Sequence, residues 1–314
     1  MGKKKVLVVG GSGYIGRRIV KASLAEGHET YVIQRPEAEV GLQIEKVQML
    51  LSFKKQGVRI LRASFSDHNS LVDAVKKVDV VISAISGVHI RTHCITLQLK
   101  LVQAIKEAPN VMRFLPSEFG LDPARMGDAL EPGRVTFEDK MAVRKAIEEA
   151  NIPYTYISAN LFAGYFAGSL SQMDSLMPPR DKVSLFGDGT KKAVFLDEDD
   201  VATYTIKAID DSRTLNKTVY LRPPENILSQ AELIGIWEKL IGKELEKTYI
   251  PPEGFLATLK GLDYKLQVAI GHFYHIFYEG CLTNFEIGED GVEASKLYPE
   301  VNYTRMHEYL KIYA

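Results

Sequence analysis

The stretch "KVLVVGGSGYIGRRIV", residues 5–20, is the clearest indication of the fold in this sequence. It begins with a short β-branched run, which is typical of a buried parallel strand, and it passes into a helical pattern from about Tyr14. Between the two lie Gly10, Gly11, Gly13 and Gly16. They can be read as GxxGxxG or, from the second glycine, as GxGxxG. Either pattern lets the backbone turn tightly and approach a pyrophosphate at a helix N-terminus, so the stretch predicts a dinucleotide-binding loop.

The alternation of strand and helix patterns continues through the first half of the chain. Further strands are predicted at 29–33, 58–61, 78–84, 111–115 and 153–157. Strands that alternate with helices predict an α/β fold, a Rossmann doubly wound parallel sheet with right-handed crossovers. The second half is less regular, and we expect a smaller α/β lobe there. The predicted domains are a cofactor-binding domain, 1–157, and a substrate-binding lobe, 158–314, interleaved with it.

Composition excludes several classes of protein. The chain has 314 residues, of which 46% are hydrophobic and 25% are charged, and its net charge is -1. There is no basic field for nucleic acid and no polybasic membrane anchor. No segment approaches the roughly 20 apolar residues of a membrane span. The two cysteines, Cys94 and Cys281, are isolated and form no CxxC pair, so we expect a reducing, cytoplasmic location.

The end of the second predicted strand indicates which dinucleotide is bound. An acidic residue there would bind the ribose 2′-hydroxyl of NAD, but the sequence is "VIQRPE". The Arg35 guanidinium can bind a 2′-phosphate through two hydrogen bonds. Lys46 is either a second cation at this phosphate or a surface lysine. The cofactor is therefore predicted to be NADPH. The loop residues expected to contact it are Gly10, Gly11, Ser12, Gly13, Tyr14, Ile15 and Gly16.

The fourth predicted strand ends in small residues, "ISAISG" at 82–87. In this fold such a strand end lies at the cofactor crevice, so Ser83, Ala84 and Ser86 are candidate cofactor neighbours. Close packing of the strand end explains the same residues equally well.

Lys140 lies in "TFEDKMAVRKAIEEANIPYTYI", residues 136–157, which is a helix pattern that runs into a strand. It falls at the edge of an apolar face that contains Val143 and Ile147. An ordinary short-chain dehydrogenase has a tyrosine four residues before its lysine, but this chain has Thr136. A carbonyl reductase with a Tyr-Lys pair is therefore disfavoured. Periodicity alone leaves two readings, a snorkelling lysine and a base with a lowered pKa.

Several segments together resemble one plant family. They are "VGGSGYIG", "KVQMLLSFKK", "RFLPSEFG", "TFEDKMAVRKAIE", "NLFAGYFAG" and "GDGTKKAVFLDEDDVATYT". The chain resembles the plant benzylic ether reductases over nearly its whole length, and within them most closely the pinoresinol–lariciresinol reductases. The resemblance implies an NADPH-dependent, atypical short-chain reductase that forms a homodimer. It also implies that Lys140 is the base, that Arg144 assists at the cofactor and that His272 faces the substrate.

The implied reaction needs no carbonyl group. A lignan carries a phenol para to a benzylic ether carbon, so removal of the phenol proton opens the furan ring to a quinone methide, which accepts hydride at the benzylic carbon. The implied activity is reduction of pinoresinol to lariciresinol and on to secoisolariciresinol. One alternative is reduction of phenylcoumaran benzylic ethers or isoflavones. Another, of a different class, is an NADP-sensing regulator without catalysis.

The remaining candidates concern the walls of the site. Asn160 and Phe162 are candidates to cover the nicotinamide, and Phe166 is a candidate to accept an aryl ring, although core packing explains all three as well. Gly87, Val88 and Gln98 are candidates to shape the substrate pocket. No metal is expected, because the histidines have no carboxylate in the same pattern and the acidic run at 197–200 is typical of a helix N-terminus.

Overall fold

The computed structural model describes residues 2–34, 44–86 and 94–314. The chain forms two compact units. Unit 1 comprises Met1–Glu118, Asp139–Ile157 and Ala202–Val219, and unit 2 comprises Phe119–Glu138, Ser158–Val201 and Tyr220–Ala314. Segments from both halves of the sequence therefore contribute to each unit.

Unit 1 is built on a five-stranded sheet with the strand order β3-β2-β1-β4-β5. All four strand pairs within it are parallel. The strands are β1 (Lys5–Val9), β2 (Glu29–Gln34), β3 (Arg59–Arg62), β4 (Val80–Ser83) and β5 (Arg113–Leu115). The order reverses beside β1, which is the switch point of a doubly wound sheet. The predicted fold class is confirmed.

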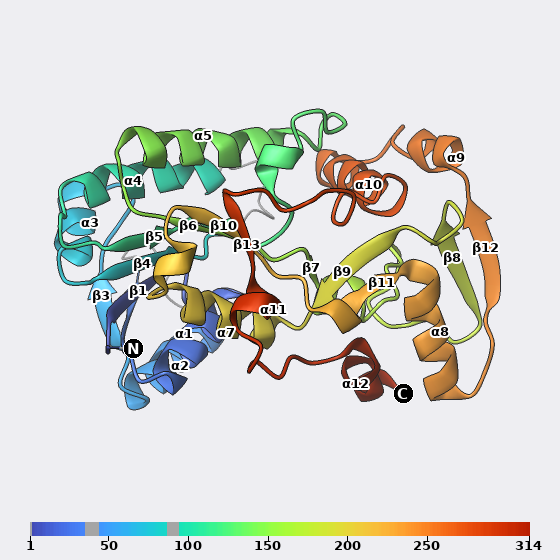
Figure 1. Cartoon of the computed structure of the whole chain (residues 1–314), viewed down its shortest axis with the longest axis horizontal. Coiled ribbons are helices and arrows are strands. Elements are labelled where there is room, and N and C mark those ends of the chain that lie inside the picture. The colour runs from blue at the N-terminus through green and yellow to red at the C-terminus, as the bar shows by residue number, and fades with distance from the viewer. Residues whose placement is uncertain (1, 35–43, 87–93) are drawn as a thin grey trace. The chain divides into compact units, whose positions relative to one another are not determined.

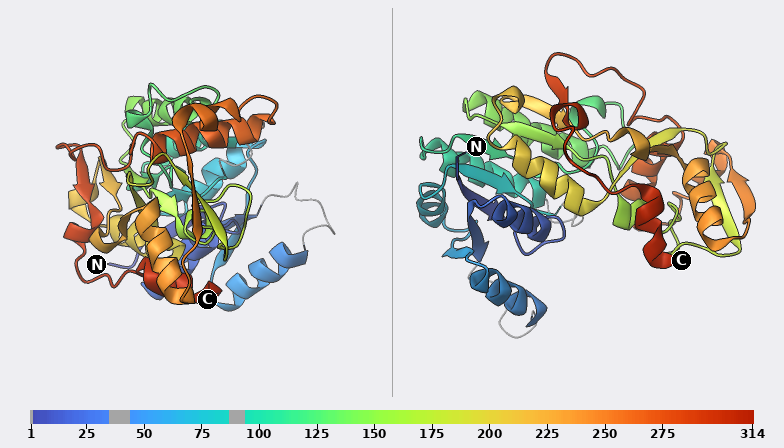
Figure 2. Two further views of the ribbon diagram at one scale, coloured as in Figure 1. Left: turned by 90° about the vertical axis from the view of Figure 1, so that its right-hand side faces the viewer. Right: turned by 60° about the horizontal axis from the view of Figure 1, so that its bottom comes forward.

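Helices cover both faces of this sheet. Figure 1 shows α3 (His68–Val75), α4 (Gln98–Lys106) and α5 (Val135–Glu149) on one face and α1 (Gly16–Ala25) on the other. Helix α2 (Ile44–Lys55) lies beside β3 and projects from the sheet (Figure 2). Apolar side chains of the strands and of α3, α4 and α5 form one buried cluster around Leu101, Phe114 and Ile147. Burial on both faces explains why β1 and β4 are nearly continuous apolar runs.

The last predicted strand of the first half differs in its partner. Residues Thr155–Ser158 form β6, which belongs to a second sheet with β10 (Lys217–Tyr220). Its link to β5 is the bridge between Phe114 and Tyr154, where the N–H of Phe114 donates to the carbonyl of Pro153. Because Pro153 has no N–H, it cannot return a hydrogen bond to β5.

Unit 2 contains two small sheets. In the first, β9 (Lys192–Leu196) lies between β7 (Leu161–Phe162), which is parallel to it, and β11 (Ile227–Ser229), which is antiparallel. In the second, β8 (Lys182–Phe186) pairs in parallel with β12 (Glu246–Ile250). The remaining elements of unit 2 are α6 (Ala163–Phe166), α8 (Gln230–Ile241), α9 (Pro252–Ala257), α10 (Tyr264–Phe277), β13 (Gly291–Glu293), α11 (Ala294–Leu297) and α12 (Met306–Tyr309). Helix α7 (Glu198–Ala208) begins in unit 2 and belongs to unit 1 from Ala202 onward.

Local sequence explains where α8 begins and ends. The Ser229 side chain accepts from the N–H of Glu232, and the Glu232 side chain accepts from the N–H of Ser229, which is a capping box. Gly242 ends the helix in the left-handed conformation, at φ +65°. None of the helices in the described ranges is long and apolar enough to cross a membrane.

Candidate active site

The glycine loop between β1 and α1 has the geometry of a phosphate-binding turn. Gly10 has φ +84°, and a Cβ on it would lie 2.6 Å from the Ala84 carbonyl oxygen. A Cβ on Gly16 would lie 2.1 Å from the Gly10 carbonyl oxygen. The helix then begins after Ile15, whose side chain gives no capping hydrogen bond. The loop therefore requires glycine at both positions, and it presents a helix N-terminus without a side-chain cap.

The end of β4 lies against this loop. The Ala84 N–H donates to the Val9 carbonyl at 2.7 Å, which continues the β1–β4 ladder to the loop. The Ser83 side chain is fully buried, and among the described residues its Oγ has no hydrogen-bond partner. A buried hydroxyl without a partner is costly, so a ligand group beside it would be favoured. The structure thus brings Ser83 and Ala84 together with the glycine loop, and Ser86 follows on the exposed side.

The candidates for the 2′-phosphate are only partly described. Arg35 falls outside the described residues, as do Gly87 and Val88. Lys46 lies in the first turn of α2 and is half-buried. The selection of NADPH by Arg35 and Lys46 stays a prediction.

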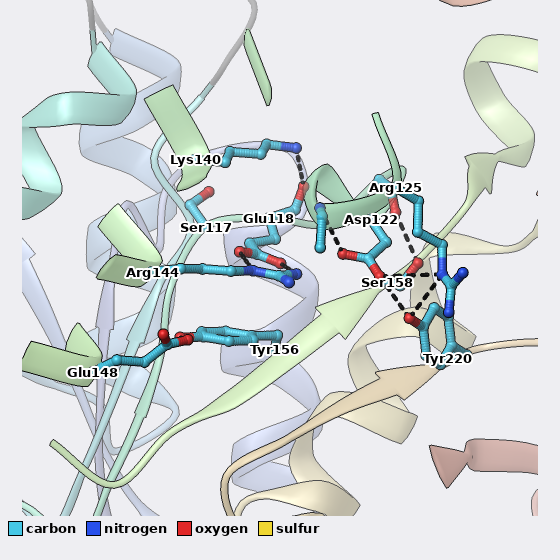
Figure 3. A network of polar contacts seen from close by, with 12 residues as sticks. Ser117, Glu118, Asp122, Arg125, Lys140, Arg144, Glu148, Tyr156, Ser158 and Tyr220 are labelled. Atoms are coloured by element: carbon cyan, nitrogen blue, oxygen red, sulfur yellow. Dashed lines mark hydrogen bonds and ion pairs between the residues drawn. The ribbon is translucent and has the colours of Figure 1, made fainter. Parts of the chain in front are cut away.

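Lys140 lies on α5 and is half-buried. Its Nζ donates a hydrogen bond of 2.7 Å to the backbone carbonyl oxygen of Glu118, which follows β5 (Figure 3). Thr136, four residues earlier, has a buried Oγ1 without a hydrogen-bond partner in the part of the chain that the structure describes. The amine therefore donates to a main-chain acceptor, and the position four residues earlier carries no tyrosine hydroxyl.

One turn further along α5, Arg144 forms a bidentate ion pair with Glu118. Its Nε donates to Oε1 at 2.7 Å and its Nη2 donates to Oε2 at 2.5 Å. Both side chains are buried, with 6% and 2% of their surface exposed. The guanidinium also stacks on Tyr156, with Cζ 4.1 Å from the ring centre. The Arg144 guanidinium is therefore held from two sides, and its predicted role at the cofactor stays a prediction.

Tyr156 completes this cluster on the side away from Glu118 (Figure 3). Its hydroxyl donates to Glu148 at 3.0 Å. Burial, with the nearby Glu148 and Glu118 carboxylates, holds the pKa of Tyr156 far above its usual value. The hydroxyl therefore stays protonated and acts as a donor, not as a second base.

Gln98 supports the turn that carries Glu118. Its side-chain carbonyl accepts from the Ser117 N–H at 2.7 Å, and its amide donates to Ile95. The Ser117 hydroxyl donates to the Ile85 carbonyl at 2.7 Å. The Gln98 side chain is 1% exposed, so the structure places it beneath the turn. Its role in shaping the substrate pocket stays a prediction.

His272 lies on α10 in unit 2. Its Nε2 is 3.1 Å from the Gly133 carbonyl oxygen, and its ring centre lies 4.8 Å from that of Phe137. A carbonyl can only accept, so Nε2 carries the proton in this contact. The predicted contact of His272 with the substrate stays a prediction.

The other predicted residues of unit 2 have partners within that unit. Asn160 has φ +53°, and its amide donates to the Leu221 carbonyl at 2.7 Å. Phe162 stacks on Tyr165, and Phe166 lies against Phe273. These contacts agree with core packing as well as with a wall of aromatic rings, so their ligand roles stay predictions.

A second polar cluster lies in unit 2, beside a small cavity. The Tyr220 hydroxyl donates to Asp122 at 2.5 Å, and Arg125 donates to the Tyr220 oxygen (Figure 3). The Arg125 guanidinium also stacks on Phe285, at 3.5 Å from the ring centre. Asp122, Arg125 and Phe285 line the cavity together with Asn160. No sequence pattern indicated this cluster.

Glu118 is the residue of the site that the sequence did not indicate. The segment "RFLPSEFG" carried part of the family resemblance, but no residue of it was selected as a site residue. Its signal is a polar pair, Ser117 and Glu118, directly after an apolar strand end. In a parallel sheet such positions face the crevice where ligands bind.

Comparison with known proteins shows the family of the chain. The model of the NmrA-like family matches residues 2–310. The chain is 74% identical to an isoflavone reductase homolog of Lupinus albus over 100% of both chains. It is 69% identical to a bifunctional pinoresinol-lariciresinol reductase of Linum perenne over 98% of both. The solved structure "AtPrR2 with NADP+ and (+)pinoresinol" superposes with a TM-score of 0.96 at 62% identity over 100% of both chains.

Proposed function

We propose that the chain is an NADPH-dependent reductase of lignans, because it belongs to the NmrA-like family. Within that family it groups with plant pinoresinol–lariciresinol reductases and isoflavone reductase homologs. It reduces pinoresinol to lariciresinol, and lariciresinol to secoisolariciresinol. The observation that carries the proposal is the Lys140 amine held on the Glu118 carbonyl, without a tyrosine at the position of Thr136. A lysine without a tyrosine four residues before it fits a base better than it fits the Tyr-Lys pair of a carbonyl reductase.

The residues of unit 1 fit a dinucleotide. The glycine loop leaves no room for a Cβ at Gly10 and Gly16. The buried Ser83 hydroxyl beside the loop has no hydrogen-bond partner among the described residues. We assign the phosphates to residues 10–16 and the adjoining part of the cofactor to the end of β4. NADPH, when bound, supplies the hydride for the benzylic carbon.

Lys140 then removes the proton of the substrate phenol. The phenoxide electrons move through the ring and expel the para benzylic oxygen, so the C–O bond breaks and a quinone methide forms. Hydride addition at the electrophilic benzylic carbon restores the phenoxide, which takes its proton back from Lys140, and the released alkoxide takes a proton from water. A phenol titrates near 10, which is close to lysine, so proton transfer between the two costs little. We assign contacts to the substrate to His272 and to the ring of Phe166.

One incubation tests the proposal. Purified protein, NADPH and racemic pinoresinol are combined and the products are separated by chiral chromatography with mass detection. We expect products with two and four added hydrogens, and none from Lys140→Ala. Their absence from wild type would refute lignan reduction. The 74% identical isoflavone reductase homolog makes isoflavones and phenylcoumarans the substrates to examine next. NADPH binding without turnover of any of them would indicate a regulator.

A further inference from the structure

We propose that Glu118 and Arg144 are positioning residues, which act together to orient Lys140 through the Glu118 main-chain carbonyl. This inference rests on the proposed function, because it assumes that Lys140 is the base. It assigns to Arg144 a role through Glu118 in place of a contact with the cofactor.

The first step of the argument is that one residue connects the base to the ion pair. The carbonyl oxygen of Glu118 accepts from Lys140, and its carboxylate accepts both donors of the Arg144 fork. Lys140 and Arg144 are four residues apart on α5, so they project from the same side of the helix. The helix therefore holds Glu118 at two points, the main-chain carbonyl and the carboxylate, so loss of the ion pair would leave the Glu118 main chain held by α5 at the carbonyl alone.

The second step is that the turn around Glu118 does not hold this carbonyl by local preference. Phe119, the next residue, has φ +23°, a conformation that side chains other than glycine rarely adopt. Such a conformation persists only where the surroundings enforce it. Ser117 is fixed on one side by Gln98 and Ile85, and the Arg144 fork fixes Glu118 itself.

The third step concerns the cost of this arrangement. Burial of a carboxylate and a guanidinium carries a desolvation penalty that their attraction barely offsets, and an apolar pair of similar size would stabilise the fold as well. A bidentate ion pair defines direction as well as distance, so it orients Glu118 in a way that an apolar pair would not. A base must meet its proton within hydrogen-bond distance, and a displacement of about 1 Å costs up to about 100-fold in rate.

The test is a double-mutant cycle on the full-length protein. Glu118→Gln, Arg144→Met and the double variant are assayed for kcat and KM with pinoresinol, and the Kd of NADPH is measured by fluorescence. We expect each single variant to lose about 10- to 100-fold in kcat with the Kd of NADPH unchanged. The kcat of the double variant should be no lower than that of the less active single variant, because both changes release the same carbonyl.

Arg113→Met is the matched control for a structural effect. Arg113 is also a buried arginine of unit 1, but it donates to Thr155 and Thr214 and to main-chain carbonyls. Its loss should lower the melting temperature and leave kcat per folded molecule unchanged. If a single variant fails to fold, the double variant, which buries no unpaired charge, still reports the loss of kcat.

Three outcomes would overturn the inference. Weaker NADPH binding in Arg144→Met alone would assign Arg144 to the cofactor. Losses of kcat that multiply in the double variant would show two independent roles. Variants with wild-type kcat would show that the pair does not orient the base. If wild type itself reduces none of the substrates, the proposed function fails and the inference fails with it, whereas active wild type with unchanged variants refutes the inference alone.

Discussion

Lys140 donates through its Nζ to the main-chain carbonyl of Glu118 at 2.7 Å. Lys140→Ala would remove both this hydrogen bond and the basic nitrogen, so that variant does not distinguish the effects of the two. Arginine at the same position also carries donors, but it stays protonated at every accessible pH.

Lys140→Arg should therefore keep the fold and the affinity for NADPH but lose turnover. Because general base catalysis contributes about 10²- to 10⁴-fold, we expect a loss of kcat in this range. The measurement is the rate of pinoresinol consumption beside a fluorescence titration with NADPH. Retention of more than about a tenth of the wild-type rate would show that Lys140 acts through its charge and not as a base.

Gly16→Ala should prevent the glycine loop from forming as it does here. The new Cβ would lie 2.1 Å from the Gly10 carbonyl oxygen, so the main chain must move. We expect NADPH affinity to fall at least about tenfold. Gly235→Ala in α8 is the control, because a Cβ there meets no atom within 4 Å. That variant should gain up to about 1 kcal/mol in unfolding free energy and bind NADPH normally. Equal NADPH affinities for both variants would refute the assignment of the loop.

The sequence was sufficient for the features that depend on neighbouring residues. The glycine loop and the helix of Lys140 each lie within about 15 residues of chain, where turn chemistry and periodicity act directly. The position of Lys140 at the edge of an apolar helix face also followed from spacing alone.

The role of Glu118 could not be read in the same way. Its partner Arg144 is 26 residues away, and the contact depends on how α5 packs beside the end of β5. The same limit applies to Gln98, which reads as a pocket residue but whose side chain holds the Ser117 N–H. The exchange of segments such as 119–138 and 202–219 between the two units is likewise a tertiary feature without a local signal.

Tyr220→Phe should destabilise unit 2. The mutation removes the hydroxyl that donates to Asp122, whose carboxylate is buried and keeps Ala124 N–H as a donor. Loss of a donor to a buried charged group costs about 1 to 3 kcal/mol. Urea unfolding measures the change, and Tyr249→Phe, at an exposed tyrosine of β12, is the control. A difference below about half a kcal/mol would show that water replaces the hydroxyl.

Asp200→Asn should change how stability depends on pH. Burial is the main cause that raises the pKa of Asp200 from 3.8 to about 6, while the Thr304 N–H donates to its carboxylate at 2.7 Å. The folded state therefore binds this proton more tightly than the unfolded state, so wild type loses stability as the pH rises from about 4 to about 6. The lost amount is up to about 3 kcal/mol at one pKa unit per 1.36 kcal/mol.

Asparagine keeps an acceptor for Thr304 but carries no charge to bury, so the variant should not show this loss. Its unfolding free energy relative to wild type should therefore increase between pH 4 and pH 7, as measured by urea unfolding at both values. Asp73→Asn, on the exposed side of α3, is the matched control and should give the same difference at both pH values. If the difference in unfolding free energy between Asp200→Asn and wild type were the same at both pH values, the Asp200 carboxylate would be ionised in the folded protein without a cost in free energy. The hydrogen bond from the Thr304 N–H would then be sufficient to stabilise its charge.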